Sequence, residues 1–245
     1  GDRLEVKVKG YGAGEESWVI HHEQLWGDPG RDEVWQMLEN VRTRAWEHES
    51  GAEMRIQAMC IDSGGHHTEN VYRYVKPRQP QRVWATKGMS QPGRPLVGRP
   101  SRANKHGVKL LPIGTDTAKD AVFARLKVNV PGPLYMHFPD FLDDEYFAQL
   151  TAEKVVTRYH KGRPVRRYEK TRPRNEALDL EVLCLAALVS MGTPVIQSLG
   201  TYAEKVRVEG AKRREQEEGA KKAEAPAAPP RPAVRRPKGW VRGWR

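Results

Sequence analysis

The chain has 245 residues and a mass of 27.8 kDa, which suits one large domain or one domain with appendages. Hydrophobic residues make up 38% of it and charged residues 30%, which excludes a chain that is disordered throughout. No apolar run approaches the roughly 18–20 residues of a membrane-spanning helix, and the first residues lack the apolar block of a secretory signal. Two cysteines, Cys60 and Cys184, are too few for a disulfide framework, and we expect buried thiols in a reducing compartment.

The first half of the chain is predicted to begin with a hairpin. Residues 4–8 alternate apolar and charged side chains, which predicts a half-exposed strand, and a glycine-rich turn separates them from a second strand at 17–25. The next predicted elements are a helix at 32–47, a buried strand at 54–61, a helix at 68–75 capped by Thr68, and a strand at 82–86.

The second half is predicted to alternate in the same way. Its predicted elements are a strand at 108–113, a helix from Thr115 or Asp116 to 127, a strand at 134–138, a helix at 143–150, a basic hairpin of 155–159 and 165–168, and a helix at 175–191. This order predicts an α/β domain at 1–200 with a mixed sheet flanked by helices. Residues 201–245 are predicted to be a charged, Pro/Ala/Arg-rich flexible tail whose first part, 202–222, continues as a helix.

The net charge of +11 is concentrated in three segments. Residues 76–109 hold nine Lys or Arg and no acid, residues 161–174 hold seven against Glu169 alone, and the tail is also basic. Basic segments on an otherwise acidic body favour a polyanionic partner, although a merely solvated surface is the alternative. The candidate DNA-binding residues are Lys87, Arg94, Arg99, Arg102, Lys105, Lys161 and Arg163.

Three acids are the candidate catalytic residues. Asp62 ends an apolar strand and precedes two glycines, and ligands of open α/β sheets gather at that end of a strand; an ordinary turn is the alternative. Asp179 lies on a helix that is apolar around almost its whole circumference, with Glu176 one turn earlier. A carboxylate on such a helix would lose its hydration at a cost unless it is paired or metal-bound, which favours a site, whereas the alternative is that both acids favour the helix dipole.

Acids that converge beside basic segments suit divalent metal ions that activate water against a phosphodiester, and Mg²⁺ and Mn²⁺ prefer such oxygen ligands. Two ions bridged by Asp62, Glu176 and Asp179 would stabilise both the attacking and the leaving oxygen. The chain contains no Walker A motif, no GxSxG elbow and no GxGxxG loop.

Seven strings in order carry a family resemblance: GYGAGEESWVI (10–20), GAEMRIQAMCIDSGGHHTENVY (51–72), KGMSQPGRPLVGRPSR (87–102), GTDTAKD (114–120), MHFP (136–139), LTAEK (150–154) and RNEALDLEVLCLAAL (174–188). Over about residues 2–192 the chain resembles the nuclease domain of the lambda-type, or GpA family, tailed-phage terminase large subunit. The resemblance implies an RNase H-like endonuclease that uses two Mg²⁺ or Mn²⁺ ions to cut concatemeric double-stranded DNA during packaging.

The resemblance also implies partners and roles for particular residues. Asp62 matches the acid of the family's DSGG string, Glu176 and Asp179 match those of NEALD, and Lys87 matches the lysine of the KG string. The implied partners are double-stranded DNA, the terminase small subunit, the portal of the procapsid and an ATPase motor domain of the full-length protein. The implied location is the cytoplasm of an infected or lysogenic bacterial host.

One family feature is not matched. Members carry a strand with a metal-binding aspartate, in a string like AGVDVQ, immediately before the position of Gly1, whereas Asp2 falls in the turn that follows it. We therefore expect weak metal binding and poor or no cleavage from this chain. The competing interpretations are a catalytically impaired DNA- or portal-docking module and a cellular Holliday-junction or RNase H-type enzyme.

Overall fold

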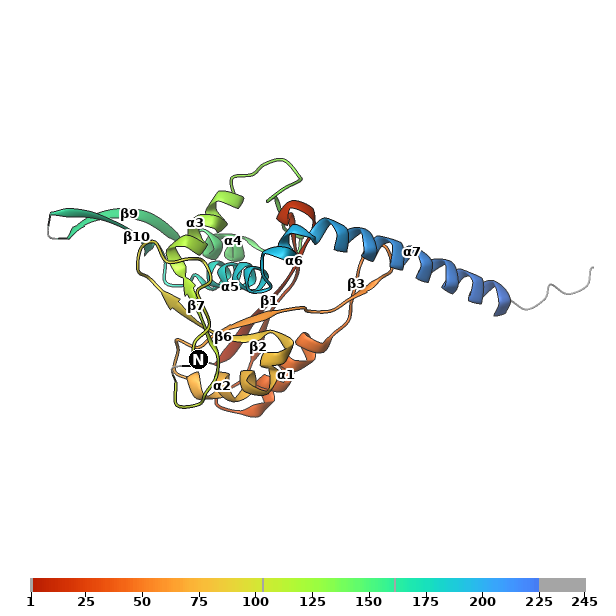
Figure 1. Ribbon diagram of the computed structural model, residues 1–245, viewed down its shortest axis with the longest axis horizontal. Coiled ribbons are helices and arrows are strands. Elements are labelled where there is room, and N and C mark those ends of the chain that lie inside the picture. The colour runs from red at the N-terminus through yellow and green to blue at the C-terminus, as the bar shows by residue number, and fades with distance from the viewer. Residues whose placement is uncertain (1, 103, 161, 225–245) are drawn as a thin grey trace, which may run out of the picture.

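The computed structural model describes residues 2–102, 104–160 and 162–224 (Figure 1). The strands are β1 (Arg3–Tyr11), β2 (Ser17–Trp26), β3 (Trp46–Glu47), β4 (Glu53–Met54), β5 (Met59–Asp62), β6 (Val83–Met89), β7 (Leu110–Gly114), β8 (Met136–His137), β9 (Glu153–His160) and β10 (Arg163–Lys170). The α-helices are α1 (Asp32–Thr43), α2 (Thr68–Val75), α3 (Thr115–Arg125), α4 (Asp144–Leu150), α5 (Glu176–Ser190), α6 (Thr193–Gln197) and α7 (Leu199–Glu224). Short 3₁₀ turns are η1 (Ala13–Glu15) and η2 (Lys76–Gln81).

The strands form several sheets rather than the one mixed sheet that the sequence predicted. β1 and β2 form the expected antiparallel hairpin, and β2 also pairs in parallel with the short β8. β5, β6 and β7 form a separate, parallel sheet of three strands. In the described part of the chain β1 pairs with β2 alone and β5 with β6 alone, so the two sheets are not joined by hydrogen bonds.

Both sheets nevertheless contribute to the same two hydrophobic cores. On one side, Val6 and Val8 of β1 and Val83 and Ala85 of β6 pack in one cluster with α1 and α2. On the other side, the second cluster contains residues of α3, α4 and α5. Because side chains alternate across a strand, this arrangement places the strands in a layer between two layers of helices. Figure 1 shows α1 and α2 on one side of the long β1–β2 hairpin and α3, α4 and α5 on the other.

The core is not purely apolar where β1 meets α5. Lys7 and Lys9 extend from the face of β1 opposite Val6 and Val8, and both ammonium groups pair with the Glu181 carboxylate on α5. The side chains of all three residues are almost completely buried. The prediction that β1 is a half-exposed strand was therefore wrong, because α5 supplies a carboxylate that allows the lysine face to be covered.

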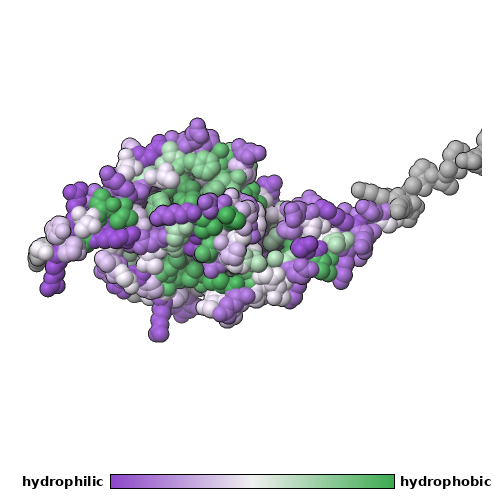
Figure 2. All heavy atoms as spheres, turned by 90° about the horizontal axis from the view of Figure 1, so that it is seen from above, coloured by the Kyte–Doolittle hydropathy of each residue, from purple (hydrophilic) through white to green (hydrophobic). Residues whose placement is uncertain are grey.

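Two elements project from the body in opposite directions. The β9–β10 hairpin extends from one end, and α7 extends from the other (Figure 1). The surface of the projecting α7 is mostly hydrophilic, with a few hydrophobic atoms among the purple ones in Figure 2. The hairpin and the helical character of residues 202–222 confirm the corresponding predictions. The predicted flexible segment from 225 onward lies outside the described residues.

Most other differences concern the ends of elements. The helix predicted at 32–47 ends at Thr43, because residues 46–47 pair with 53–54 as β3 and β4. The strand predicted at 54–61 is also shorter in the structure, because Met54 belongs to β4. Only β5 remains of it, and β5 is only partly buried. Thr68 does not cap α2; instead its hydroxyl donates to the carbonyls of Ser63 and Gly65.

Both thiols are free, and each cysteine is partly rather than fully shielded from solvent. Among the described residues no helix combines the length and the apolar character needed to cross a membrane.

Candidate nuclease site

The first candidate acid, Asp62, lies at the carboxyl end of β5. Its position is fixed by the neighbouring strand: the Ser63 amide and hydroxyl both donate to the Thr86 carbonyl, at 3.0 and 2.6 Å. The Gly64 amide donates to Asp62 Oδ1 at 3.1 Å, which closes a tight turn. The Asp62 side chain is exposed, so it faces solvent at the end of the parallel sheet where ligands gather.

The second acid, Asp179, lies in the first turn of α5, which packs against both β5 and β1. Desolvation raises the pKa of the Asp179 carboxyl, the charges of Glu153 and Asp62 act in the same direction, and the ammonium groups of Lys119 and Lys170 oppose them. Asp62 and Asp179 are therefore near enough to interact electrostatically. Asp179 keeps contact with solvent, although its surroundings desolvate the carboxyl enough to raise its pKa.

Glu176 lies three residues before Asp179, in the same first turn of α5. Its carboxylate is 3.5 Å from Nε of Arg174, and its charge acts on Glu5 of β1, whose pKa is raised by burial and, in part, by that charge. Its Oε2 is buried and has no hydrogen-bond partner among the described residues. Within those residues no three Asp, Glu, His or Cys side chains are grouped closely enough to hold a metal ion.

A polar network lies near Asp179 and acts on its carboxyl through charge. Glu153, the first residue of β9, is buried and accepts hydrogen bonds from Lys119 Nζ at 2.8 and 2.6 Å and from Asn175 Nδ2 at 2.8 Å. Lys170 Nζ donates to Asn175 Oδ1 at 2.6 Å. The network thus joins α3, both strands of the β9–β10 hairpin and the start of α5.

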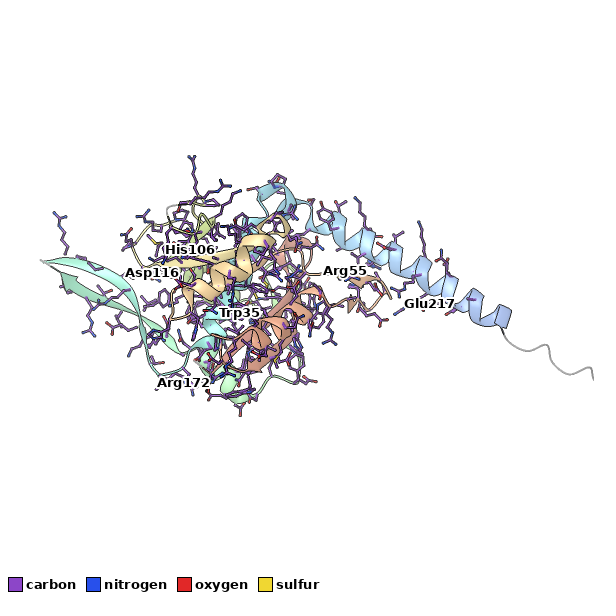
Figure 3. All side chains as sticks on the ribbon, turned by 90° about the horizontal axis from the view of Figure 1, so that it is seen from below. Trp35, Arg55, His106, Asp116, Arg172 and Glu217 are labelled. Carbon is purple, nitrogen blue, oxygen red and sulfur yellow. The ribbon has the colours of Figure 1, made fainter. Side chains whose placement is uncertain are left out.

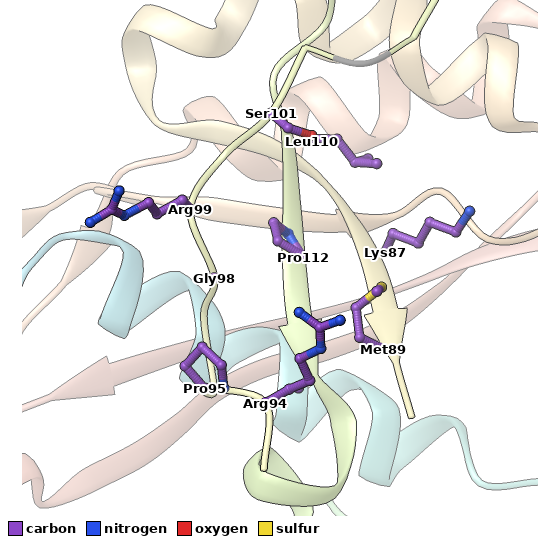
Figure 4. A pocket seen from close by; sticks show the side chains of 10 residues that line it. Lys87, Met89, Arg94, Pro95, Gly98, Arg99, Ser101, Leu110 and Pro112 are labelled. Carbon is purple, nitrogen blue, oxygen red and sulfur yellow. The ribbon is translucent and has the colours of Figure 1, made fainter. Parts of the chain in front are cut away.

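A cationic cavity of about 570 Å³ lies beside β6 and β7 (Figure 4). Its walls include Lys87 on β6 and both Arg94 and Arg99 on the connection to β7, and all three residues are exposed. Lys87 and Arg99 lie on opposite sides of β7 in this view, with Arg94 between them. The floor includes Pro112 and Gly114 of β7. Three cations around one cavity provide a site where anionic groups are favoured.

The remaining candidate DNA-binding residues are more scattered. Arg102 and Lys105 are exposed on the segment that leads to β7, and Lys105 Nζ pairs with Glu69 at 2.9 Å. Arg163 is exposed at the start of β10, near the tip of the hairpin. Lys161 lies outside the described residues.

The base of the basic hairpin is held firmly against α3. Tyr168 stacks on Phe123 with ring centroids 5.7 Å apart, and its hydroxyl donates to Asp120 at 2.5 Å. Arg166 also pairs with Asp120. Figure 3 shows Asp116, on the same helix as Asp120, and Arg172 at the end of the body from which the hairpin extends. The hairpin is therefore an arm attached beside the acidic pair.

Comparison with known proteins identifies the family. Residues 1–198 match the family described as terminase large subunit gpA, endonuclease domain. The chain belongs to this terminase nuclease family. It is 37% identical over 194 residues to the terminase large subunit of Escherichia phage lambda and 35% identical over 198 residues to that of Enterobacteria phage P21. Each match covers 76% of this chain and 30% of the relative, so the chain spans less than a third of these relatives. No solved structure gives a significant match.

The family assignment confirms the resemblance that the ordered strings indicated. Within this terminase nuclease domain, the structure gathers three of the candidate cations around one cavity, and the charge of Asp62 acts on Asp179. Residue-by-residue reasoning missed Lys119, Glu153 and Asn175. The available signal was that the strings GTDTAKD, LTAEK and RNEALDLEVLCLAAL, which carry the resemblance, contain all three.

Proposed function

We propose that this chain is a metal-dependent endonuclease domain of a terminase large subunit, which cuts concatemeric double-stranded DNA during genome packaging. The observation that carries the proposal is that Asp62 ends a parallel strand, β5, which packs against α5, the helix whose first turn carries Asp179. Family membership and the adjacent cationic surfaces support it. Phosphodiester hydrolysis assisted by two metal ions is the reaction that suits such carboxylates.

The donor set fits Mg²⁺ or Mn²⁺. Mg²⁺ is commonly held by one or two carboxylates together with waters and substrate phosphate, and Asp62 and Asp179 offer two exposed carboxylates. Glu176, in the same turn of α5 as Asp179, is a third carboxylate that would exchange its ion pair with Arg174 for such a site. The chemistry that bound ions supply is the activation of water and the neutralisation of charge on the phosphate.

The chain's own residues bind and orient the substrate in this proposal. Lys87, Arg94 and Arg99 receive backbone phosphates, which are contacts that do not depend on base sequence. Cations of the β9–β10 arm provide a second set of contacts beside Asp179. Gly64 and Gly65 carry no side chain beyond Asp62, so a phosphate can approach that carboxylate closely.

A third acidic ligand would come from a further strand between β1 and β5. The unpaired edges of these strands, their shared cover by α5 and their contributions to the same cores support such an insertion. Each edge presents backbone groups that hydrogen-bond to an added strand. In the RNase H-like arrangement that we propose, this strand carries the family's aspartate and completes a single mixed sheet.

Extending this chain at Gly1 by about 15 residues, which is enough for a strand of the AGVDVQ type and its turn, is expected to increase Mn²⁺-dependent cleavage of plasmid DNA. The reason is that the added strand joins the two sheets and adds an acid to the Asp62–Asp179 pair. Extension with a strand whose aspartate is replaced by asparagine is the matched control. Equal cleavage by the original and the extended chains would refute the missing-strand proposal.

Alanine substitution of Lys87, Arg94 or Arg99 is expected to weaken binding to a short DNA duplex of arbitrary sequence. Each lost phosphate contact should reduce the slope of log K against log salt by about 1, measured by fluorescence anisotropy without divalent metal. Lys212→Ala is the matched control, because Lys212 is an exposed cation on the projecting α7. An unchanged salt dependence in all three variants would show that the cationic cavity does not contact the phosphates of the DNA.

Three further partners follow from the family and belong to this proposal: the terminase small subunit, the portal of the procapsid and an ATPase motor domain within the same protein. The site of action would be the bacterial cytoplasm.

The second candidate function is a catalytically impaired DNA- or portal-docking module. It is favoured by one observation, that no three acids are grouped as a metal site in the described residues.

A further inference from the structure

The buried Glu153 network has no role in the binding of DNA or metal as described above. Glu153 is an acid with a 3% exposed side chain, paired with Lys119, whose side chain is 13% exposed. A buried carboxylate needs partners that satisfy its charge, and here Lys119 and Asn175 provide three hydrogen bonds. Neither partner belongs to the same element as Glu153, so the network joins separate parts of the fold.

Asn175 connects this network to Asp179 through the backbone. Asn175 precedes the first residue of α5, and its carbonyl accepts the amides of Leu178 at 3.0 Å and Asp179 at 3.1 Å. Its side chain does not cap the helix but is held between Glu153 and Lys170. The orientation of Asn175, and with it the first turn of α5, is therefore fixed by groups outside the helix.

Lys119 connects the network to Asp179 through charge. The ammonium group is held by both Glu153 oxygens, and its charge acts on the Asp179 carboxylate. Without Glu153, this ammonium would be free to move to another acid on α3, such as Asp116, on which it also acts. The same carboxylate thus fixes the backbone that carries Asp179 and the cation beside it.

We propose that Glu153 is a positioning residue of the nuclease site, which holds Asn175 and Lys119 so that the first turn of α5 presents Asp179 to Asp62. This inference rests on the proposed function. In this proposal Glu153, which lies outside the acidic pair at the base of the β9–β10 arm, sets the geometry of that pair. Outer carboxylates that orient metal ligands typically contribute about 10–100-fold to metal affinity or activity.

The test uses Glu153→Ala and Glu153→Gln in the 245-residue chain. Hydrogen–deuterium exchange of the amides of residues 178 and 179 reports on the first turn directly, whether or not the chain cleaves DNA. We expect faster exchange there in Glu153→Ala, with unchanged exchange in the middle of α5. Mn²⁺ affinity, measured by calorimetry, should fall by about 10–100-fold in Glu153→Ala. Glu153→Gln, which keeps the shape and can still accept from Asn175, should recover part of both effects.

Asp120→Asn is the matched control, because Asp120 is an acid on α3 that holds Arg166 and Tyr168 of the arm without contacting Asn175. It should leave both the exchange of residues 178–179 and the Mn²⁺ affinity unchanged. Wild-type exchange in Glu153→Ala would overturn the inference, and so would faster exchange with undiminished Mn²⁺ affinity. If the wild-type chain binds no Mn²⁺ in both its original and extended forms, the proposed function itself fails, and the inference fails with it.

Discussion

Replacing Asp179 with asparagine is expected to reduce Mn²⁺-dependent DNA cleavage by at least about 10³-fold, at the upper end of the loss seen when one group that stabilises transition-state charge is removed. Asparagine keeps the shape of the side chain, so the first turn of α5 should remain intact. The loss should come from the missing negative charge beside Asp62, which a divalent cation requires. Single-turnover cleavage of supercoiled plasmid, by whichever of the original and extended chains is active, measures the effect.

Glu176→Gln is the matched control for that substitution. Glu176 is in the same turn of the helix, but its carboxylate is paired with Arg174, and its charge acts on Glu5. We therefore expect a smaller loss of cleavage from Glu176→Gln than from Asp179→Asn. DNA affinity without metal should be undiminished in both variants. Unchanged cleavage by Asp179→Asn would show that the Asp62–Asp179 pair is not the catalytic centre.

Replacing Glu181 with alanine is expected to destabilise the fold by about 3–5 kcal/mol, the typical cost of leaving buried charge without its partner. Both Lys7 and Lys9 would lose their common carboxylate in a region where all three side chains are almost fully buried. Urea unfolding followed by circular dichroism measures the change in the free energy of unfolding. The combined variant Lys7→Met, Lys9→Met, Glu181→Leu is the control, because an apolar replacement of the whole cluster should recover most of the loss.

Lowering the pH should decrease the free energy of unfolding through the same cluster of Lys7, Lys9 and Glu181. Burial alone would raise the pKa of Glu181, but the charges and hydrogen bonds of Lys7 and Lys9 outweigh it and lower the pKa to about 2. Since the unfolded value is 4.5, the stability that this group contributes is fully present above about pH 4.5 and is lost as the pH falls toward 2. The combined apolar variant should lack this part of the acid sensitivity. An identical pH dependence in both proteins would contradict the assignment.

Local pattern was sufficient to locate most elements. Alternation and turn glycines predicted the β1–β2 hairpin, and helical periodicity predicted α2 and α5 to within a residue at each end. These signals come from neighbours in the chain, which is why they can be read without a tertiary structure. The short strands β3 and β4 were not predicted, because two residues of pairing leave no periodic pattern, and β8 is shorter than the strand predicted at 134–138.

The candidate site was predictable only in part. Asp62 was identifiable because an acid that follows an apolar strand and precedes glycines has a local signature. The partners of Glu176 and Asp179 had no such signature, since Arg174 pairs with Glu176 whereas charges on α3 and on the β9–β10 hairpin act on Asp179. The gathering of Lys87, Arg94 and Arg99 around one cavity likewise depends on how the connection to β7 folds back.

By itself, the sequence determined the order of the elements, the basic segments and the family. The tertiary structure alone decided which charges are buried: Lys7, Lys9 and Glu153 look like surface residues in the sequence, yet each is enclosed by the protein. The physical reason is that a buried charge is stable only beside its counter-charge, and the partners lie on other elements, up to 174 residues away. Residues so far apart in the sequence come into contact only when the helices pack against the sheets.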